Sequence, residues 1–228
     1  MCAIHDPGEK MYANTPPQQE MNAQPGPMPT NVPTNPELHP VFQHGFYLIR
    51  KKFIKILGGA FHVFDENNNL IFFSEQKGLK LKEDLRIYSD ESKSTELLKI
   101  TTPQILDLGA TYNVVDSSTG MYIGALRRKM GASLFKDTWH YLDHNGQQIG
   151  MLTEPSMFGA MLSRFMHFIP QKYVSMTMDG REVSRINMMF NPIILKYRLT
   201  INEALPPIDR RLIIAGGILL AAIEGRQK

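Results

Sequence analysis

The sequence predicts a mainly β domain, a barrel or a sandwich, whose strands surround a buried helix at the C-terminus. Short runs rich in β-branched and aromatic residues begin at Phe46, and turn residues separate them about every ten residues, as in all-β proteins. The only long apolar run lies near the C-terminus, within residues 209–226. With 228 residues and 43% hydrophobic content, the chain is large enough to form one sizeable core.

The C-terminal apolar run is too short to cross a bilayer as a helix. No charged or polar side chain interrupts it from Leu212 to Ile223, which gives a helix of roughly 18 Å, whereas a hydrocarbon core of about 30 Å needs roughly 20 residues. The run is apolar around its whole circumference, so no face suits water, and Asp209 is a suitable N-cap. We expect a central buried helix over about 209–225, with membrane insertion as the alternative.

Hairpins account for most of the region before this helix. The Asp179-Gly180 pair favours a type I′ turn, which would place Met176 opposite Val183. The expected hairpins join 60–64 with 70–73, 111–115 with 121–126, 137–142 with 148–152, and 173–178 with 181–186, and further strands are expected at 79–81, 85–88, 97–100 and 193–201.

Residues 1–44 form a proline- and glutamine-rich tail that precedes a domain over 45–228. The tail holds nine of the fifteen prolines. It has one basic and four acidic residues, a charge of −3, so the rest of the chain carries +6 and the whole chain has a formal net charge of +3. Such a segment buries too little apolar surface to offset its ordering entropy, so we expect it to be disordered. A proline-ligand pattern at 33–36 leaves protein partners through the tail open.

Cysteine usage and the start of the chain indicate a cytoplasmic protein. Cys2 is the only cysteine, which excludes an intramolecular disulfide. The first ten residues become polar after four positions and lack the apolar stretch of a signal peptide. We therefore expect a cytoplasmic location and leave membrane association open.

No motif in the sequence predicts catalysis, a cofactor or a metal site. The folded region has no G-x-S-x-G elbow and no cysteine nucleophile, and Gly58-Gly59 lacks the lysine and hydroxyl of a phosphate loop. His140 and His144 have a metal-ligand spacing that requires a helix, but they flank an expected strand and turn. We expect a non-enzymatic protein without cofactor or metal, and the mild charge excess does not predict nucleic-acid binding.

Basic clusters are the features most indicative of function. If these basic residues lie on one face of a barrel, each would contribute about 1 kcal/mol to the free energy of binding to an anionic bilayer. The alternative is that they are ordinary solvated positions on strands and at the barrel rims. The candidate anionic-lipid contacts are Arg50, Lys51, Lys52, Lys55, Arg127, Arg128, Lys129, Lys196 and Arg198.

One interval, 155–168, has helical instead of strand spacing. Its methionines and phenylalanines recur at i, i+4 and i+8, which predicts a short amphipathic helix that covers one end of the barrel. Nearby basic residues also suit an interfacial membrane contact. The candidate interfacial residues are Met157, Phe158, Met161 and Phe165.

Four stretches follow one another along the chain: FHVFDENNNLIFFS, ATYNVVDSSTGMYIGALRRK, DTWHYLDHNGQQIGMLTE and PIDRRLIIAGGILLAAIE. Together they resemble the tubby C-terminal-like superfamily, in particular LURP-one-related proteins and phospholipid scramblases. Their order covers roughly Phe46 to Glu224. The resemblance implies a closed antiparallel β-barrel of about twelve strands around a hydrophobic C-terminal helix. Scramblases also carry a cysteine cluster and an acidic calcium segment, for which this chain offers only Cys2, and Glu203 with Asp209.

Together these observations favour a phospholipid-interacting domain that contacts membranes peripherally or senses lipid. Two alternatives remain open at this stage. One is a protein-interaction or structural module without lipid affinity. The other is a phospholipid scramblase inserted by its C-terminal helix.

Overall fold

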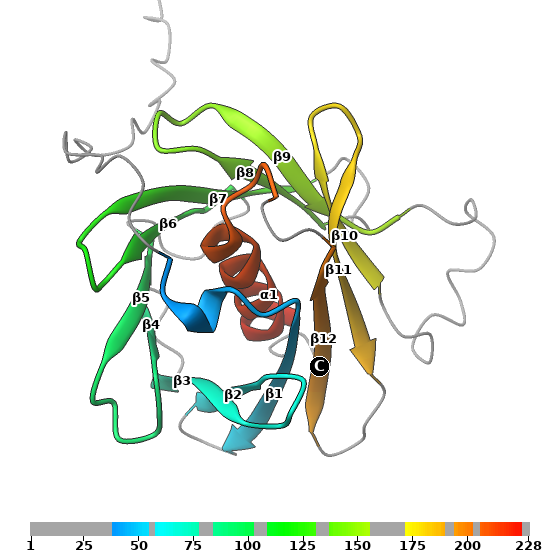
Figure 1. Cartoon of the computed structure of the whole chain (residues 1–228). Coiled ribbons are helices and arrows are strands. Elements are labelled where there is room, and N and C mark those ends of the chain that lie inside the picture. The colour runs from blue at the N-terminus through cyan, green and yellow to red at the C-terminus, as the bar shows by residue number, and fades with distance from the viewer. Residues whose placement is uncertain are drawn as a thin grey trace, which may run out of the picture.

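The computed structural model describes residues 38–54, 58–77, 84–102, 109–130, 137–155, 172–189, 194–202 and 206–224. In this part of the chain twelve strands surround one helix, α1, and a short 3-10 helix, η1 (Pro40–Phe42), lies across one end (Figure 1). The predicted strands at 79–81 and the predicted helix at 155–168 lie outside the described residues, apart from residue 155.

The strands form a closed antiparallel barrel. Neighbours in sequence pair with each other around the ring, and β1 pairs with β12 to close it, with Arg50 opposite Lys196. This confirms the predicted fold class and excludes the sandwich. The strands are β1 (Phe46–Ile54), β2 (Gly58–Phe64), β3 (Leu70–Lys77), β4 (Leu85–Tyr88), β5 (Glu96–Thr101), β6 (Thr111–Asp116), β7 (Tyr122–Met130), β8 (Asp137–Leu142), β9 (Gln148–Thr153), β10 (Lys172–Thr177), β11 (Glu182–Met189) and β12 (Leu195–Ile201).

Helix α1 (Arg210–Glu224) runs inside this barrel, as the apolar run predicts. Every residue from Arg210 to Ile223 is buried, because inward side chains of the strands pack around the whole helix. Gly216 and Gly217 allow this close packing: a Cβ at Gly216 would lie 2.9 Å from Tyr141 Oη. None of the described helices has the length and apolarity that a membrane span requires.

The two ends of the barrel differ. At the end we call the turn end, short turns join β2–β3, β4–β5, β6–β7, β8–β9 and β10–β11, and α1 begins. Four of these turns open with an aspartate whose carboxylate accepts the backbone N–H two residues later, at 2.8–2.9 Å: Asp65, Asp90, Asp116 and Asp143. Such Asx turns fix tight reversals. At the other end, the loop end, α1 terminates, and residues outside the described part connect the strands.

Two details of the predicted organisation are wrong. Residues 38–44 belong to the domain, not the tail, because Phe42 is only 1% exposed and stacks on Phe72 in the core. The turn after β10 is not type I′: Gly180 has positive φ but Asp179 does not, and the turn closes with Thr177 N–H donating to the Arg181 carbonyl, so that Met176 lies opposite Glu182. The extra residue in the loop shifts the register away from Val183.

Candidate functional site

The predicted lipid contacts lie on two opposite walls of the barrel, not on one face. Arg50, Lys196 and Arg198 share the wall of β1 and β12, whereas the Arg127–Lys129 cluster is on β7. In the ring of twelve strands, β7 is six positions from β1 in either direction. The expectation that these clusters converge on one face is therefore wrong, because sequence order does not reveal position around the ring.

Lys51 lies inside the barrel and is not a surface contact. It is 3% exposed, and its Nζ donates to the carbonyls of Ala221 at 3.3 Å and Ala222 at 3.1 Å. These carbonyls belong to the last turn of α1, where the helix dipole favours a cation. The Phe61 ring, with its centroid 5.1 Å from Nζ, adds a cation–π contact. Lys51 thus holds the C-terminal end of α1 in place.

Arg128 also differs from its neighbours Arg127 and Lys129. It is half-buried, and its Cζ lies 5.7 Å from the centroid of the buried Trp139 ring. Arg127 and Lys129 are exposed, as strand alternation requires for the two positions on the outer face. Lys52 lies in β1, opposite Ala60, and Lys55 is outside the described residues.

The cations on opposite walls share the loop end of the barrel. Lys196 is the second residue of β12, Lys172 is the first of β10, and Lys129 is the last but one of β7. Because neighbouring strands are antiparallel, these positions all lie at the loop end. The turn end carries the turn carboxylates of Asp65, Asp90, Asp116, Asp143 and Asp179, while the described part of the loop end also holds Asp84 and Glu154. Among the described residues the carboxylates are therefore more numerous at the turn end, and the three lysines lie at the loop end.

Several cations on the described strands have no carboxylate partner, although Lys99, near the loop end, pairs with Asp84 at 3.4 Å. Six cations of the described chain form no ion pair with a carboxylate: Arg50, Arg127, Lys129, Lys172, Lys196 and Arg198. Arg86, Lys93, Lys99 and Arg185, in contrast, each pair with an acidic residue. The uncompensated charge thus lies on β1, β12, β10 and β7.

His140 is the strand partner of Arg127 and lies close to the basic residues of β7. Partial burial, together with the positive charges of Lys129 and Arg127, lowers the pKa of His140 below its usual value of 6.5. Burial, the larger of these causes, disfavours a charge of either sign, and the charges of Lys129 and Arg127 add a smaller effect against a further cation.

The predicted interfacial residues Met157, Phe158, Met161 and Phe165 lie outside the described residues. Their segment leaves β9 after Thr153 and returns to β10 at Lys172, so both of its attachment points are at the loop end. Met189, at the end of β11, is one of two large hydrophobic residues that are exposed in the described chain, with 37% of its surface exposed, and it pairs with Lys196.

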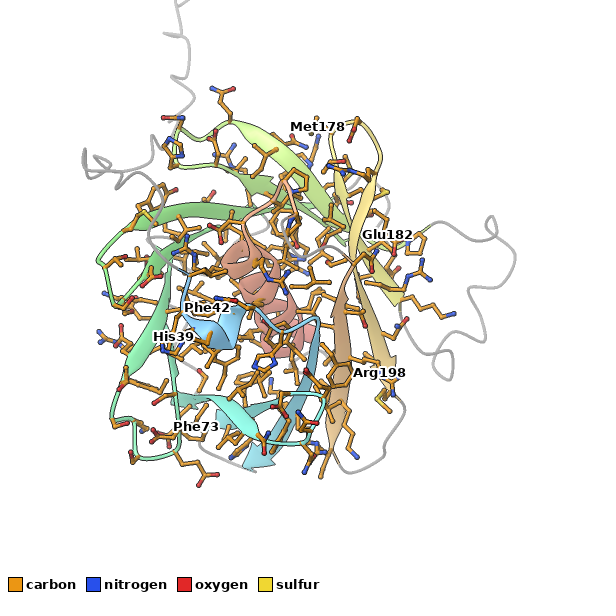
Figure 2. The ribbon with its side chains drawn as sticks, in the orientation of Figure 1. His39, Phe42, Phe73, Met178, Glu182 and Arg198 are labelled. Atoms are coloured by element: carbon orange, nitrogen blue, oxygen red, sulfur yellow. The ribbon has the colours of Figure 1, made fainter. Side chains whose placement is uncertain are left out.

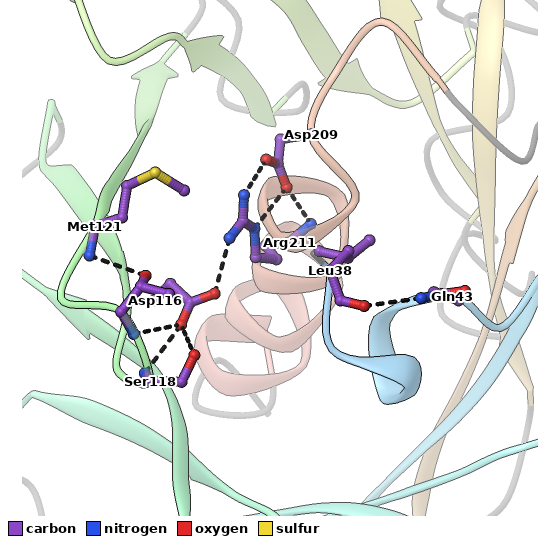
Figure 3. Close-up of polar contacts among 8 residues, drawn as sticks. Leu38, Gln43, Asp116, Ser118, Met121, Asp209 and Arg211 are labelled. Atoms are coloured by element: carbon purple, nitrogen blue, oxygen red, sulfur yellow. Dashed lines mark hydrogen bonds and ion pairs between the residues drawn. The ribbon is translucent and has the colours of Figure 1, made fainter. Parts of the chain in front are cut away.

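At the turn end the polar contacts are structural. Arg211 Nη1 donates to Asp116 at 2.8 Å and Nη2 to Asp209 at 2.7 Å, so the first turn of α1 is tied to the β6–β7 turn (Figure 3). The sequence shows Asp209 as an N-cap but gives no sign of the Asp116 pair, which joins residues 95 positions apart. Among the described residues no group of three potential metal ligands comes together.

Comparisons of the chain with protein-family models, with curated proteins and with solved structures find no match. The resemblance to the tubby C-terminal-like superfamily therefore remains a prediction from the sequence.

Proposed function

We propose that this chain is a non-enzymatic domain that binds anionic phospholipid surfaces with the loop end of its barrel. The observation that carries the proposal is the gathering of unpaired cations at this end, on strands from opposite walls. When the loop end faces the bilayer, Lys129, Lys172 and Lys196 can all reach the membrane surface. When either wall faces the bilayer, they cannot all do so.

The magnitudes favour a weak, reversible contact. Each cation near an anionic leaflet contributes about 1 kcal/mol, so these three lysines supply roughly 3 kcal/mol, and 1 mM affinity corresponds to about 4 kcal/mol. Tighter binding requires apolar insertion. Met189 is exposed beside Lys196, and the Met- and Phe-rich segment 156–171 is attached at the same end.

The insertion alternative finds less support. All residues of α1 from Arg210 to Ile223 are buried by the strands, and Lys51 and Arg211 tie its two ends to the barrel. Inserting α1 into a bilayer would require these contacts to break and the barrel to open.

Vesicle pelleting tests the proposal. Purified protein is mixed with phosphatidylcholine vesicles, or with vesicles that also contain phosphatidylserine, between about 50 mM and about 500 mM salt. We expect pelleting with the anionic vesicles only and release as the salt concentration rises. Absence of binding to both would contradict the proposal and favour a protein-interaction module. Binding that resists high salt and alkaline extraction would favour insertion.

A matched pair of variants identifies the docking end. Lys129→Glu combined with Lys196→Glu reverses two charges at the loop end and should abolish pelleting. Lys93→Glu combined with Arg181→Glu changes the net charge equally, but both residues lie in turns at the opposite end. Equal losses in both variants would show a response to net charge alone and would refute end-on docking.

A further inference from the structure

The outer wall formed by β12, β1 and β2 carries an apolar strip. Phe46, Leu48 and Phe64 are half-exposed on the outer face, whereas Tyr47 and Ile49 between them point inward and are 0% exposed. The register brings the strip together, because Leu48 pairs with Phe64 on one side and with Arg198 on the other. Outward strand positions that face water are usually polar, so this strip requires an explanation.

Two arginines are held against the strip by its aromatic rings. The Cζ of Arg50 lies 4.3 Å from the Phe64 centroid, and that of Arg198 lies 5.8 Å from the Phe46 centroid. Arg198 is exposed and points away from the barrel at β12 (Figure 2). Arg50 Nη2 donates to Asn68 Oδ1 at 2.9 Å, while its Nε is buried without a partner. Both distances lie within the range of a cation–π contact, which favours these positions of the guanidinium groups over the strip.

The strip has no acidic counterpart on its own strands. β12, β1 and β2 contain arginine, lysine and histidine but no aspartate or glutamate. The wall ends at His62, whose Nε2 lies 2.7 Å from Glu91 Oε1 of the β4–β5 turn. A partner complementary to this wall must therefore supply both apolar side chains and negative charge.

We propose that this wall binds an acidic, partly apolar peptide segment of another protein. Arg50 and Arg198 are diagonal neighbours across β1 and β12, a spacing of roughly 7–8 Å. Carboxylates on alternate residues of an extended peptide lie roughly 7 Å apart, and each carboxylate can accept two parallel hydrogen bonds from one guanidinium. An apolar side chain two residues further along the peptide, on the same face as the carboxylates, covers Phe46, Leu48 and Phe64.

Fluorescence anisotropy of the full chain tests this site. The probe is a fluorescein-labelled peptide Gly-Glu-Ser-Glu-Ser-Phe-Gly, whose glutamates and phenylalanine share one face when the peptide is extended. Its counterpart carries glutamine in place of both glutamates. We expect binding of the glutamate peptide to be about tenfold or more tighter. Arg50→Gln combined with Arg198→Gln should remove this preference, and Arg198→Lys should remove part of it, because lysine keeps the charge but not the planar donor pair.

The control changes the same charge on the opposite wall. Arg127→Gln combined with Lys129→Gln should leave the affinity for the peptide unchanged, and thermal melts establish that each variant is folded. Absence of peptide binding, equal losses from both walls, or tighter binding of a single-stranded oligonucleotide would each overturn the proposal. The lipid-docking proposal is tested independently of the peptide site, because its variants change Lys129 together with Lys196 and its readout is vesicle pelleting.

Discussion

Asp116 joins a surface turn to the central helix. Its Oδ1 accepts the Ser118 N–H at 2.9 Å, and its Oδ2 accepts Arg211 Nη1 at 2.8 Å. Burial raises the pKa of Asp116, but the hydrogen bonds from Ser118 and Arg211 and the charge of Arg211 outweigh it, so the pKa lies below the usual 3.8. One side chain thus satisfies a turn and neutralises a buried arginine.

Asp116→Asn should therefore lower the free energy of unfolding by about 3 kcal/mol, because it leaves a buried guanidinium with half of its acidic partners. Denaturant unfolding at neutral pH measures this loss. Asp143→Asn is the control. Asp143 makes comparable turn contacts, to Asn145 N at 2.9 Å and Gln147 N at 2.8 Å, but no ion pair with a described residue, so its cost should stay near 1 kcal/mol.

The same carboxylate predicts a dependence of stability on pH. Because the pKa of Asp116 is lower in the folded state, the unfolded chain binds the proton more readily. The free energy of unfolding therefore decreases as the pH falls below about 4. The wild-type protein should lose stability more steeply in this range than Asp116→Asn, which has no carboxyl to titrate. Parallel slopes of unfolding free energy against pH would contradict the role assigned to Asp116.

At the scale of the element, two adjacent glycines of α1 have different reasons to be there. A Cβ at Gly216 would lie 2.9 Å from Tyr141 Oη, which is 2.9 Å from Ser175 Oγ within a buried hydroxyl network. A Cβ at Gly217 would meet the end of the Ile49 side chain at 3.1 Å. The hydroxyl of Tyr141 is fixed by its hydrogen bond, whereas the terminal methyl of an isoleucine can move.

Gly216→Ala should thus destabilise the protein by about 1–3 kcal/mol, because overpacking exceeds the gain in helix propensity. Gly217→Ala should be close to neutral, since about 1 kcal/mol of propensity offsets a smaller clash. Thermal melts of the two variants compare the sites under identical conditions. A stabilised Gly216→Ala would show that α1 does not pack as closely on β8 as the structure indicates.

At the scale of the whole molecule, local signals predict the fold and non-local geometry determines the site. The turn aspartates and the apolar run of α1 are visible within a few residues, so the strands and the central helix could be predicted. The prediction of Lys51 as a surface lipid contact is wrong, although the alternation of inward and outward side chains along β1 indicates its position. Lys51 shares a strand face with Tyr47 and Ile49, which both point inward. The separation of β1 from β7 depends on the order of all twelve strands, which no single motif contains.

The location of the unpaired lysines at the loop end makes a testable prediction about orientation, for which the hairpin of β10 and β11 supplies a matched pair of probe positions. Met178 lies in the turn at the turn end and is 58% exposed; Met189 closes β11 at the loop end and is 37% exposed. In a Cys2→Ser background, each methionine is changed singly to cysteine and labelled with an environment-sensitive fluorophore. On anionic vesicles the label at 189 should shift to the blue, because it leaves water for the interface, while the label at 178 keeps its aqueous emission. A shift at 178 instead, or equal shifts at both positions, would mean that the barrel docks in another orientation and that the unpaired lysines of the loop end do not direct it.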